Sequence, residues 1–308
     1  MFQENILLAG LASYKIGGPA RYFFAADTVD ELVKAVQEIK QKNLEFFVLG
    51  GGTNLLIDDR GFGGLVVKPN FNFIRKLSNE EVSVGAGAAI AELLDFLIEH
   101  SLSGLEWAGG LPGTVGGAIR GNAGAFGGEI KDVIRRVRSL DTETLEEIER
   151  SAPECDFEYR SSIFKKVPGK EIILSAVLAL KQGDKAAIEK AVKDKIAYRH
   201  ARHPLEYPNI GSIFKNVDVR QVPDIHLSRL KSVMKIDPFP VIPTAYLIAE
   251  AGLKGVSCGG AMISPRHTNF IVNVLQASAK DVENLITLAK DTVNQRFGII
   301  LEEEIIRV

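Results

Sequence analysis

The chain has 308 residues, of which 46% are hydrophobic and 25% charged, a composition typical of soluble globular proteins with two or three domains. Its 37 Lys and Arg residues nearly balance 39 Asp and Glu residues, for a formal net charge of −2 at pH 7. This balance argues against nucleic acid or an anionic membrane as the main partner. Cys155 and Cys258 form no Cys-x-x-Cys pair, so we expect neither a metal site nor a disulfide framework.

The N-terminus contains no basic segment, and no apolar run is long enough to span a membrane. We therefore expect a cytoplasmic protein. Residues 13–24 predict a Gly-Pro turn that leads into a short aromatic strand. Thr28 is expected to cap a helix over residues 29–40, and residues 46–49 predict a compact strand.

A glycine loop follows this strand, a sequence of elements with which α/β nucleotide sites begin. Its residues are Gly50, Gly51, Gly52, Thr53 and Asn54. The spacing matches neither the P-loop nor the Rossmann fingerprint. The loop is nevertheless suited to line a pyrophosphate with N–H and side-chain donors; a purely structural turn is the alternative.

A second and denser glycine segment lies at residues 104–128, after predicted strands at 64–68 and 81–85 and a predicted helix at 89–100. Trp107 and Phe126 interrupt the glycines, which a flexible linker would not require. Glycine permits backbone to lie directly against a ligand. The segment therefore indicates main-chain N–H groups turned toward something anionic or planar.

The rest of the chain mixes strands with longer helices. We expect strands at residues 133–140, 172–180 and 299–308, and helices at 185–200, 243–255 and 280–297. The residues alone therefore predict a nucleotide-sized ligand held by two glycine loops.

Several motifs in this order resemble those of the UDP-N-acetylenolpyruvoylglucosamine reductase (MurB) family. The motifs are Ser13-Tyr-Lys-Ile-Gly-Gly18, Leu49-Gly-Gly-Gly-Thr-Asn-Leu-Leu56, Gly109-Gly-Leu-Pro-Gly-Thr-Val-Gly-Gly117, Asn122-Ala-Gly-Ala-Phe-Gly127, Tyr159-Arg-Ser-Ser-Ile-Phe-Lys165, Gly211-Ser-Ile-Phe-Lys-Asn216, Gly252-Leu-Lys-Gly255 and Gly259-Gly-Ala-Met-Ile-Ser-Pro-Arg-His-Thr-Asn-Phe-Ile-Val-Asn273. The resemblance extends over nearly the whole chain.

The resemblance implies an α+β fold of the vanillyl-alcohol-oxidase-like FAD-binding type, with two subdomains that clasp FAD and a third that covers the substrate. We expect these parts at residues 1–69, 70–197 and 198–308, and the last strand can return to the first part. It also implies non-covalent FAD, NADPH as hydride donor and reduction of UDP-N-acetylglucosamine enolpyruvate. We expect a monomer with no nucleic-acid or membrane partner.

The resemblance also assigns roles to individual residues. Arg160 matches the arginine that stabilises developing negative charge, and Ser212 matches the proton donor. Glu304 matches the C-terminal catalytic glutamate, with Glu302 as the alternative. The expected FAD contacts are Gly50, Gly51, Gly52, Thr53, Asn54, Gly113, Thr114, Gly116, Gly117, Asn122 and Gly124, and the expected substrate contacts are Lys215, Asn216 and Arg202.

Two departures from the family pattern concern the diphosphate contacts. Val217 stands where the family often has proline, and Arg202 occupies a lysine-like position before Pro204. Between Tyr159 and Ser212 we find no tyrosine-bearing insertion, which suggests the shorter branch of the family. The competing interpretations are an oxidase with flavin tethered to His or Cys, and a flavin-binding module without turnover.

Overall fold

The computed structural model describes residues 2–236 and 239–308, and the chain divides into two compact units. Unit 1 comprises Met1–Ile6, Ala20–Gly51 and Gly63–Arg199, and unit 2 comprises Leu7–Pro19, Gly52–Phe62 and His200–Val308. The predicted division into residues 1–69, 70–197 and 198–308 stays a prediction. Unit 1 contains a four-stranded sheet, a five-stranded sheet and two short two-stranded pairs, an arrangement that is compatible with two subdomains.

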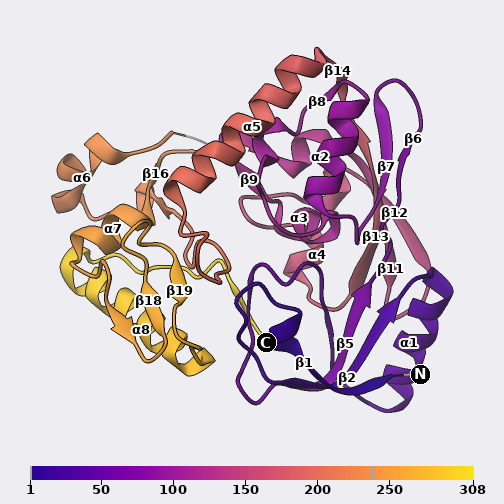
Figure 1. Ribbon diagram of the computed structural model, residues 1–308, viewed down its shortest axis with the longest axis horizontal. Helices are drawn as coiled ribbons and strands as arrows, with labels where there is room; N and C mark the ends of the chain where they lie inside the picture. The colour runs from indigo at the N-terminus through magenta and orange to yellow at the C-terminus, as the bar shows by residue number, and fades with distance from the viewer. Residues whose placement is uncertain (1, 237–238) are drawn as a thin grey trace. The chain divides into compact units, whose positions relative to one another are not determined.

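The first sheet of unit 1 has the strand order β1 (Gln3–Leu7), β2 (Pro19–Ala26), β5 (Phe62–Pro69) and β3 (Phe46–Val48). Helix α1 (Val29–Gln41) packs its apolar side against this sheet (Figure 1). The hydroxyl of Thr28 accepts a hydrogen bond from the Glu31 N–H at 3.2 Å, and the Glu31 carboxylate accepts one from the Thr28 N–H at 3.3 Å. Thr28 is thus the predicted N-cap, and such a capping box is worth roughly 1 kcal/mol.

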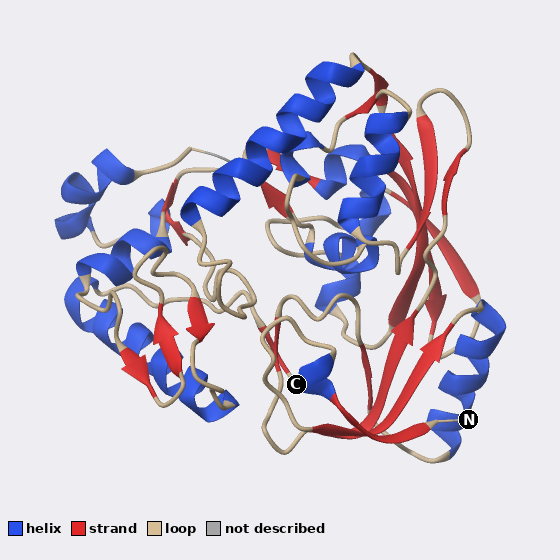
Figure 2. Ribbon diagram, in the orientation of Figure 1, coloured by secondary structure: helices blue, strands red, loops and turns tan. Residues whose placement is uncertain are grey.

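The second sheet of unit 1 is antiparallel throughout. Its strand order is β12 (Glu147–Ser151), β11 (Ile134–Asp141), β13 (Glu171–Ala179), β7 (Glu81–Gly85) and β6 (Ile74–Lys76). Val137, Ala176 and Val84 lie in register across it and are buried. Helices α2 (Ile90–Glu99) and α3 (Val115–Gly121) cover this apolar face (Figure 2).

The glycine-rich segment of unit 1 contains more regular structure than the sequence predicted. Val115, Ala118 and Ile119 are buried and form the apolar side of α3, which the prediction missed. The remaining elements of unit 1 are β8 (Leu102–Ser103), β9 (Gly124–Ala125), β10 (Gly128–Glu129), α4 (Ile163–Lys166), β14 (Lys181–Gln182) and α5 (Lys185–Arg202). The predicted helix at 185–200 is confirmed, and it continues to Arg202.

Unit 2 is built around helix α8 (Ala279–Phe297), which packs against the sheet of β17 (Ser257–Cys258), β18 (Ala261–Ile263) and β19 (Ile271–Asn273). Ser278 caps α8 through a second capping box. The smaller elements of unit 2 are β4 (Leu55–Leu56), β15 (Val217–Asp218), α6 (Asp224–Leu230), β16 (Val241–Ile242), α7 (Thr244–Glu250) and β20 (Ile306–Arg307). Strand β20 pairs in parallel with β4.

Two predicted elements are too long. The helix predicted at 243–255 is α7, which ends at Glu250 because Gly252 adopts φ +81°, a left-handed conformation that ends helices. The strand predicted at 299–308 is only β20. Residues 302–304 instead form an isolated antiparallel bridge with residues 213–215: the Glu304 N–H donates to the Ile213 carbonyl at 2.8 Å, and the Lys215 N–H donates to the Glu302 carbonyl at 2.9 Å. In the described part of the chain, no helix combines the length and apolar character that crossing a membrane requires.

Candidate functional site

The two predicted glycine loops meet within unit 1. A Cβ added at Gly51 would lie 2.7 Å from the Gly113 Cα, and one at Gly50 would lie 2.9 Å from the Thr114 hydroxyl. Separations below 3.0 Å leave no room for a side chain. The two backbones therefore touch, so the surface they present consists largely of main-chain groups.

The second loop leads directly into α3. The hydroxyl of Thr114 accepts a hydrogen bond from the Gly117 N–H at 3.4 Å and so caps the helix. A Cβ at Gly116 would lie 2.9 Å from the Ala86 Cβ of the loop after β7. The missing side chain at Gly116 thus lets α3 lie close to the five-stranded sheet. This packing fixes the direction of the loop that leads into α3.

The other half of the first loop belongs to unit 2. Gly52 adopts φ +63°, and its missing Cβ would lie 2.4 Å from the Leu11 carbonyl. The Asn54 side chain donates to the Glu304 carbonyl at 3.0 Å. Thr53 lies between them and is half-buried. This half of the loop is therefore anchored to the N-terminal and C-terminal segments of unit 2.

Arg160 occupies the tip of a tight hairpin in unit 1. Glu158 and Ser161 exchange two backbone hydrogen bonds of 3.1 Å, and Arg160 adopts φ +56°. Its Nη2 donates to the Gly124 carbonyl at 2.8 Å. The buried Asn122 joins the same assembly, since its Nδ2 donates to the Glu158 carbonyl at 2.9 Å. The structure thus brings together Arg160, Asn122 and Gly124.

Ser212 lies in unit 2, half-buried, after Gly211 with φ +80°. Two residues that follow Ser212 have side-chain interactions within unit 2. Lys215 forms an ion pair with Glu302, and the Asn216 Oδ1 accepts a hydrogen bond from the Thr244 N–H at 3.3 Å. The exposed Arg202 is the last residue of α5.

The three C-terminal glutamates differ in their surroundings. Glu302 is exposed and faces Lys215. Glu303 accepts hydrogen bonds from Lys290 and Arg307; burial raises the pKa of its carboxyl, but these two cations more than offset that effect and lower it. Glu304 is held by its backbone, through Ile213 and Asn54. The assignment of Glu304 as the catalytic glutamate, with Glu302 as the alternative, stays a prediction.

Comparisons with known proteins agree with this geometry. Residues 20–144 match an FAD binding domain, and residues 203–308 match the UDP-N-acetylenolpyruvoylglucosamine reductase, C-terminal domain. The chain is 39% identical over 306 residues to the UDP-N-acetylenolpyruvoylglucosamine reductase of Carboxydothermus hydrogenoformans, covering 98% of this chain and 93% of the relative. The chain belongs to the UDP-N-acetylenolpyruvoylglucosamine reductase family.

Two further comparisons support the same family. The chain is 37% identical to the reductase of Caldanaerobacter subterraneus, and the match covers 95% of this chain and 89% of the relative. The crystal structure of the reductase (MurB) from Thermus caldophilus matches with a TM-score of 0.78 at 30% identity, covering 100% of this chain and 99% of that one. The predicted α+β FAD-binding fold is confirmed. The assignment to the shorter branch of the reductase family stays a prediction.

Membership in the reductase family makes the chain an FAD-dependent oxidoreductase. The residues present fit the cofactor, because the missing side chain at Gly51 lets its backbone lie against that of Gly113, so that the two loops present main-chain groups. Such a surface accepts a flat or anionic group against main-chain atoms.

Sequence reasoning missed Asn269 as a positioning residue next to Ser212. Asn269 is 3% exposed. Its side chain bonds both the N–H and the carbonyl of Phe214, and its own carbonyl accepts from the Ile213 N–H at 2.8 Å. A signal was present, since an amide directly before the apolar run Phe270-Ile-Val272 needs a partner when that run is buried.

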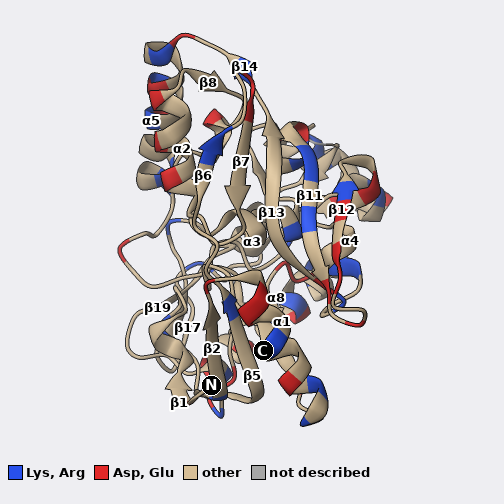
Figure 3. Cartoon of the chain, turned by 90° about the vertical axis from the view of Figure 1, so that its right-hand side faces the viewer, with Lys and Arg blue, Asp and Glu red and all other residues tan. Residues whose placement is uncertain are grey.

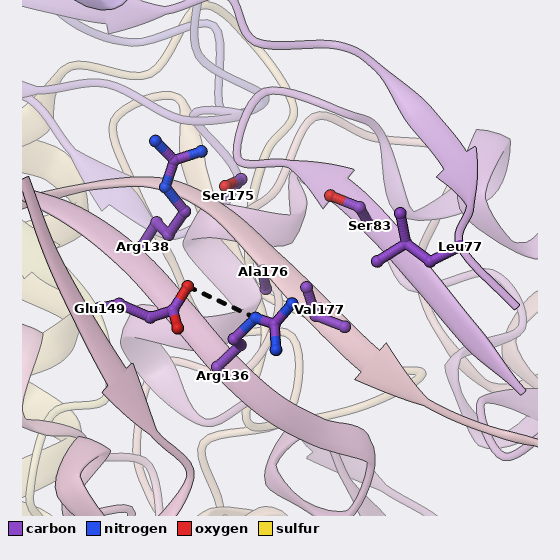
Figure 4. Close-up of a pocket in the computed structure, with 8 residues that line it drawn as sticks. All are labelled: Leu77, Ser83, Arg136, Arg138, Glu149, Ser175, Ala176 and Val177. Carbon is purple, nitrogen blue, oxygen red and sulfur yellow. Dashed lines mark ion pairs between the residues drawn. The ribbon is translucent and has the colours of Figure 1, made fainter.

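A separate hollow of about 350 Å³ lies on the five-stranded sheet (Figure 4). Its lining comprises Leu77, Ser83, Arg136, Arg138, Glu149, Ser175, Ala176 and Val177. Arg136 lies 3.4 Å from Glu149, and Arg138 pairs with Glu147. Figure 3 shows these charges along β11 and β12. The lining includes none of the predicted site residues, so the hollow is a surface feature apart from them.

Proposed function

We propose that this chain reduces UDP-N-acetylglucosamine enolpyruvate to UDP-N-acetylmuramate, with NADPH as hydride donor and FAD bound non-covalently, in the synthesis of peptidoglycan precursors. The observation that carries the proposal is the 39% identity to a reductase over 98% of the chain. The chemistry that bound FAD supplies is the transfer of hydride from NADPH to the enolpyruvyl double bond.

The two glycine loops are the proposed holders of FAD. Their backbone contact at Gly51 and Gly113 supports this role. The proposed contacts are Gly50, Gly51, Gly52, Thr53, Asn54, Gly113, Thr114, Gly116, Gly117, Asn122 and Gly124. Main-chain N–H groups are suited to the pyrophosphate, because they offer fixed donors to an anion without a flexible side chain.

Arg160 is the proposed electrostatic stabiliser. Hydride addition to the methylene carbon leaves negative charge that extends into the substrate carboxylate. A guanidinium already fixed in place stabilises that charge without reorganisation, and such a donor is worth about 10²- to 10³-fold in rate. The hydrogen bond to Gly124 and the hairpin geometry support a fixed position for Arg160.

Ser212 is the proposed donor of the proton to the neighbouring carbon. A free hydroxyl is a weak acid, so neighbouring groups have to assist it. Glu304 is the proposed partner carboxylate, and its segment lies next to the segment that contains Ser212, since the Glu304 N–H bonds to the carbonyl of Ile213.

Lys215, Asn216 and Arg202 are the proposed contacts of the UDP group. The Lys215 side chain is largely buried and already faces Glu302. Binding of a diphosphate would therefore have to compete with that carboxylate, which lies exposed at the surface.

The test is an anaerobic absorption spectrum of the purified holoenzyme. We expect a yellow protein that bleaches with NADPH and recovers its colour only after UDP-N-acetylglucosamine enolpyruvate is added. UDP-N-acetylglucosamine without the enolpyruvyl group is the control and should leave the flavin bleached. Recovery only on admission of oxygen would favour an oxidase, and a colourless protein that does not take up FAD would contradict the assignment of the glycine loops.

We further propose that the enzyme acts in the cytoplasm as a monomer, without nucleic-acid or membrane partners. NADPH and UDP-linked sugars are intracellular metabolites, and the net charge of −2 offers no strong attraction to polyanions. Light scattering of the FAD-loaded protein should give the mass of one chain. A mass of two or more chains would contradict this part of the proposal.

A further inference from the structure

Glu129 is a buried carboxylate that the proposed reaction does not yet use. It lies in β10, opposite Gly124 of β9, and is 8% exposed. Its Oε2 lies 2.5 Å from the Lys131 Nζ, whereas its Oε1 is buried and has no hydrogen-bond partner among residues 2–236 and 239–308. A buried carboxylate oxygen without a donor is costly, so its position calls for an explanation.

The local hydrogen bonds of the turn do not explain the position of the Glu129 carboxylate. The neighbouring Asp132 carboxylate already accepts the Glu129 N–H at 2.8 Å, and the Asn122 side chain accepts the Lys131 N–H at 3.3 Å. The turn after β10 is therefore held by Asp132 and Asn122. The Glu129 carboxylate adds only its pairing with Lys131.

The side chains of Glu129 and Arg160 both lie close to Gly124. A Cβ built on Gly124 would lie 2.8 Å from the Glu129 Cγ and 3.3 Å from the Arg160 Nη1. Both side chains therefore lie against the same face of one glycine, while the Arg160 Nη2 bonds to the carbonyl of that glycine. A carboxylate and a guanidinium that lie near the same glycine carry opposite charges and attract each other.

We propose that Glu129 is a positioning residue for Arg160. Its negative charge holds the guanidinium over Gly124, and Lys131 holds the carboxylate in turn. The inference rests on the proposed role of Arg160 in the reaction. A side chain with several rotatable bonds stabilises a transition state efficiently only when its orientation is fixed beforehand.

The test is Glu129→Gln in the FAD-loaded enzyme, alone and combined with Arg160→Lys. We expect Glu129→Gln to retain FAD and to lower kcat about 10-fold with KM changed less than about 3-fold, as for a group that acts in the transition state. In the Arg160→Lys background the same substitution should change kcat less than about 2-fold, because coupled residues are not additive. Substrate affinity of the oxidised enzyme, measured by calorimetry, should stay within about 3-fold.

Glu158→Gln is the matched control, because it removes an exposed carboxylate from the Arg160 hairpin, where Glu158 pairs with Lys166. We expect it to leave kcat unchanged. If Glu129→Gln does not fold, Lys131→Met serves instead, since it releases the carboxylate and should lower kcat only when Arg160 is present.

Three outcomes separate the two proposals. Equal losses from Glu129→Gln in both backgrounds would show a general structural effect and overturn the positioning role. Unchanged kcat in Glu129→Gln alongside a strong loss in Arg160→Lys would overturn it as well, while leaving the role of Arg160 intact. Wild-type kcat in Arg160→Lys itself would overturn the proposed function of Arg160.

Discussion

The side chain of Asn269 forms two hydrogen bonds with the backbone of Phe214. Its Nδ2 donates to the Phe214 carbonyl at 2.8 Å, and its Oδ1 accepts from the Phe214 N–H at 3.0 Å. The residue two positions earlier is Ser212, the proposed proton donor. One buried amide therefore fixes the segment that carries a proposed catalytic hydroxyl. Stability and turnover should both depend on this side chain.

We predict that Asn269→Ala lowers the free energy of unfolding by about 2 to 4 kcal/mol, because it leaves two buried backbone groups without partners. Urea unfolding monitored by circular dichroism measures this. Asn284→Ala is the control: the Asn284 side chain has an exposed contact with Cys258, and its loss should cost less than about 0.5 kcal/mol. Equal effects of the two substitutions would contradict the stabilising role of the two Asn269 hydrogen bonds.

Ser212→Ala should separate the two half-reactions. We expect FAD to stay bound and its reduction by NADPH to keep the wild-type rate. Reoxidation by UDP-N-acetylglucosamine enolpyruvate should slow by about 10²- to 10⁴-fold, the range for loss of a general acid. Anaerobic stopped-flow absorbance follows both steps. A wild-type rate of reoxidation would rule out Ser212 as the proton donor.

Gly51→Ala should weaken FAD binding at least about 10-fold, since 1.4 kcal/mol of steric conflict is sufficient for that. The new methyl group would lie 2.7 Å from the Gly113 Cα, and backbone cannot move aside as a side chain can. Gly63→Ala is the control, because no atom lies within 4 Å of its added Cβ. Fluorescence of the released flavin measures FAD retention in both variants. Equal retention would show that the contact between Gly51 and Gly113 is not needed for cofactor binding.

His267 should make the protein less stable as pH falls. Burial disfavours the charged imidazolium and lowers the pKa of His267 below its ordinary value of 6.5, and Lys235 acts in the same direction. The unfolded chain then binds more protons than the folded one near that pH, so stability is full above pH 6.5 and is lost as pH falls through it. His203 and Phe270 are the rings packed against His267.

The measurement is the urea midpoint at pH 7.5, 6.5 and 5.5 for wild type and for His267→Gln. The wild-type midpoint should fall more steeply with acidity than that of the variant. His200→Gln, at an exposed position, should follow the wild type. Parallel curves for wild type and His267→Gln would mean that His267 does not contribute to acid sensitivity.

Local signals were sufficient to predict the long helices. Thr28 and the apolar spacing behind it predicted α1, and the capping box supplies the physical reason. The family motifs likewise identified Arg160, Asn122 and Gly124 as site residues, whereas the bonds that group them, through the Glu158 and Gly124 carbonyls, come from the structure. Such features depend on residues close in the sequence or on patterns already known.

Long-range pairing was beyond the reach of local patterns. Residues 299–308 alternate like a strand, but only Ile306–Arg307 finds a strand partner, and that partner is Leu55–Leu56. The buried glutamate in Gly128–Glu129 was likewise invisible, because an acidic residue after two glycines usually indicates a solvated turn. What identifies Glu129 is its distance from Gly124, and no spacing rule contains that information.

The parallel pairing of β20 with β4 also sets an order of events during synthesis. Leu55–Leu56 leaves the ribosome long before Ile306–Arg307, and at 5 to 20 residues per second the delay is roughly 10 to 50 s. The early segments of unit 2, Leu7–Pro19 and Gly52–Phe62, can bond to each other in that interval, as the Gly18 N–H does to the Asp58 carbonyl at 2.9 Å. Strand β4, however, stays without its parallel partner until Ile306–Arg307 has been synthesised, and a stop before Ile306 leaves it unpaired.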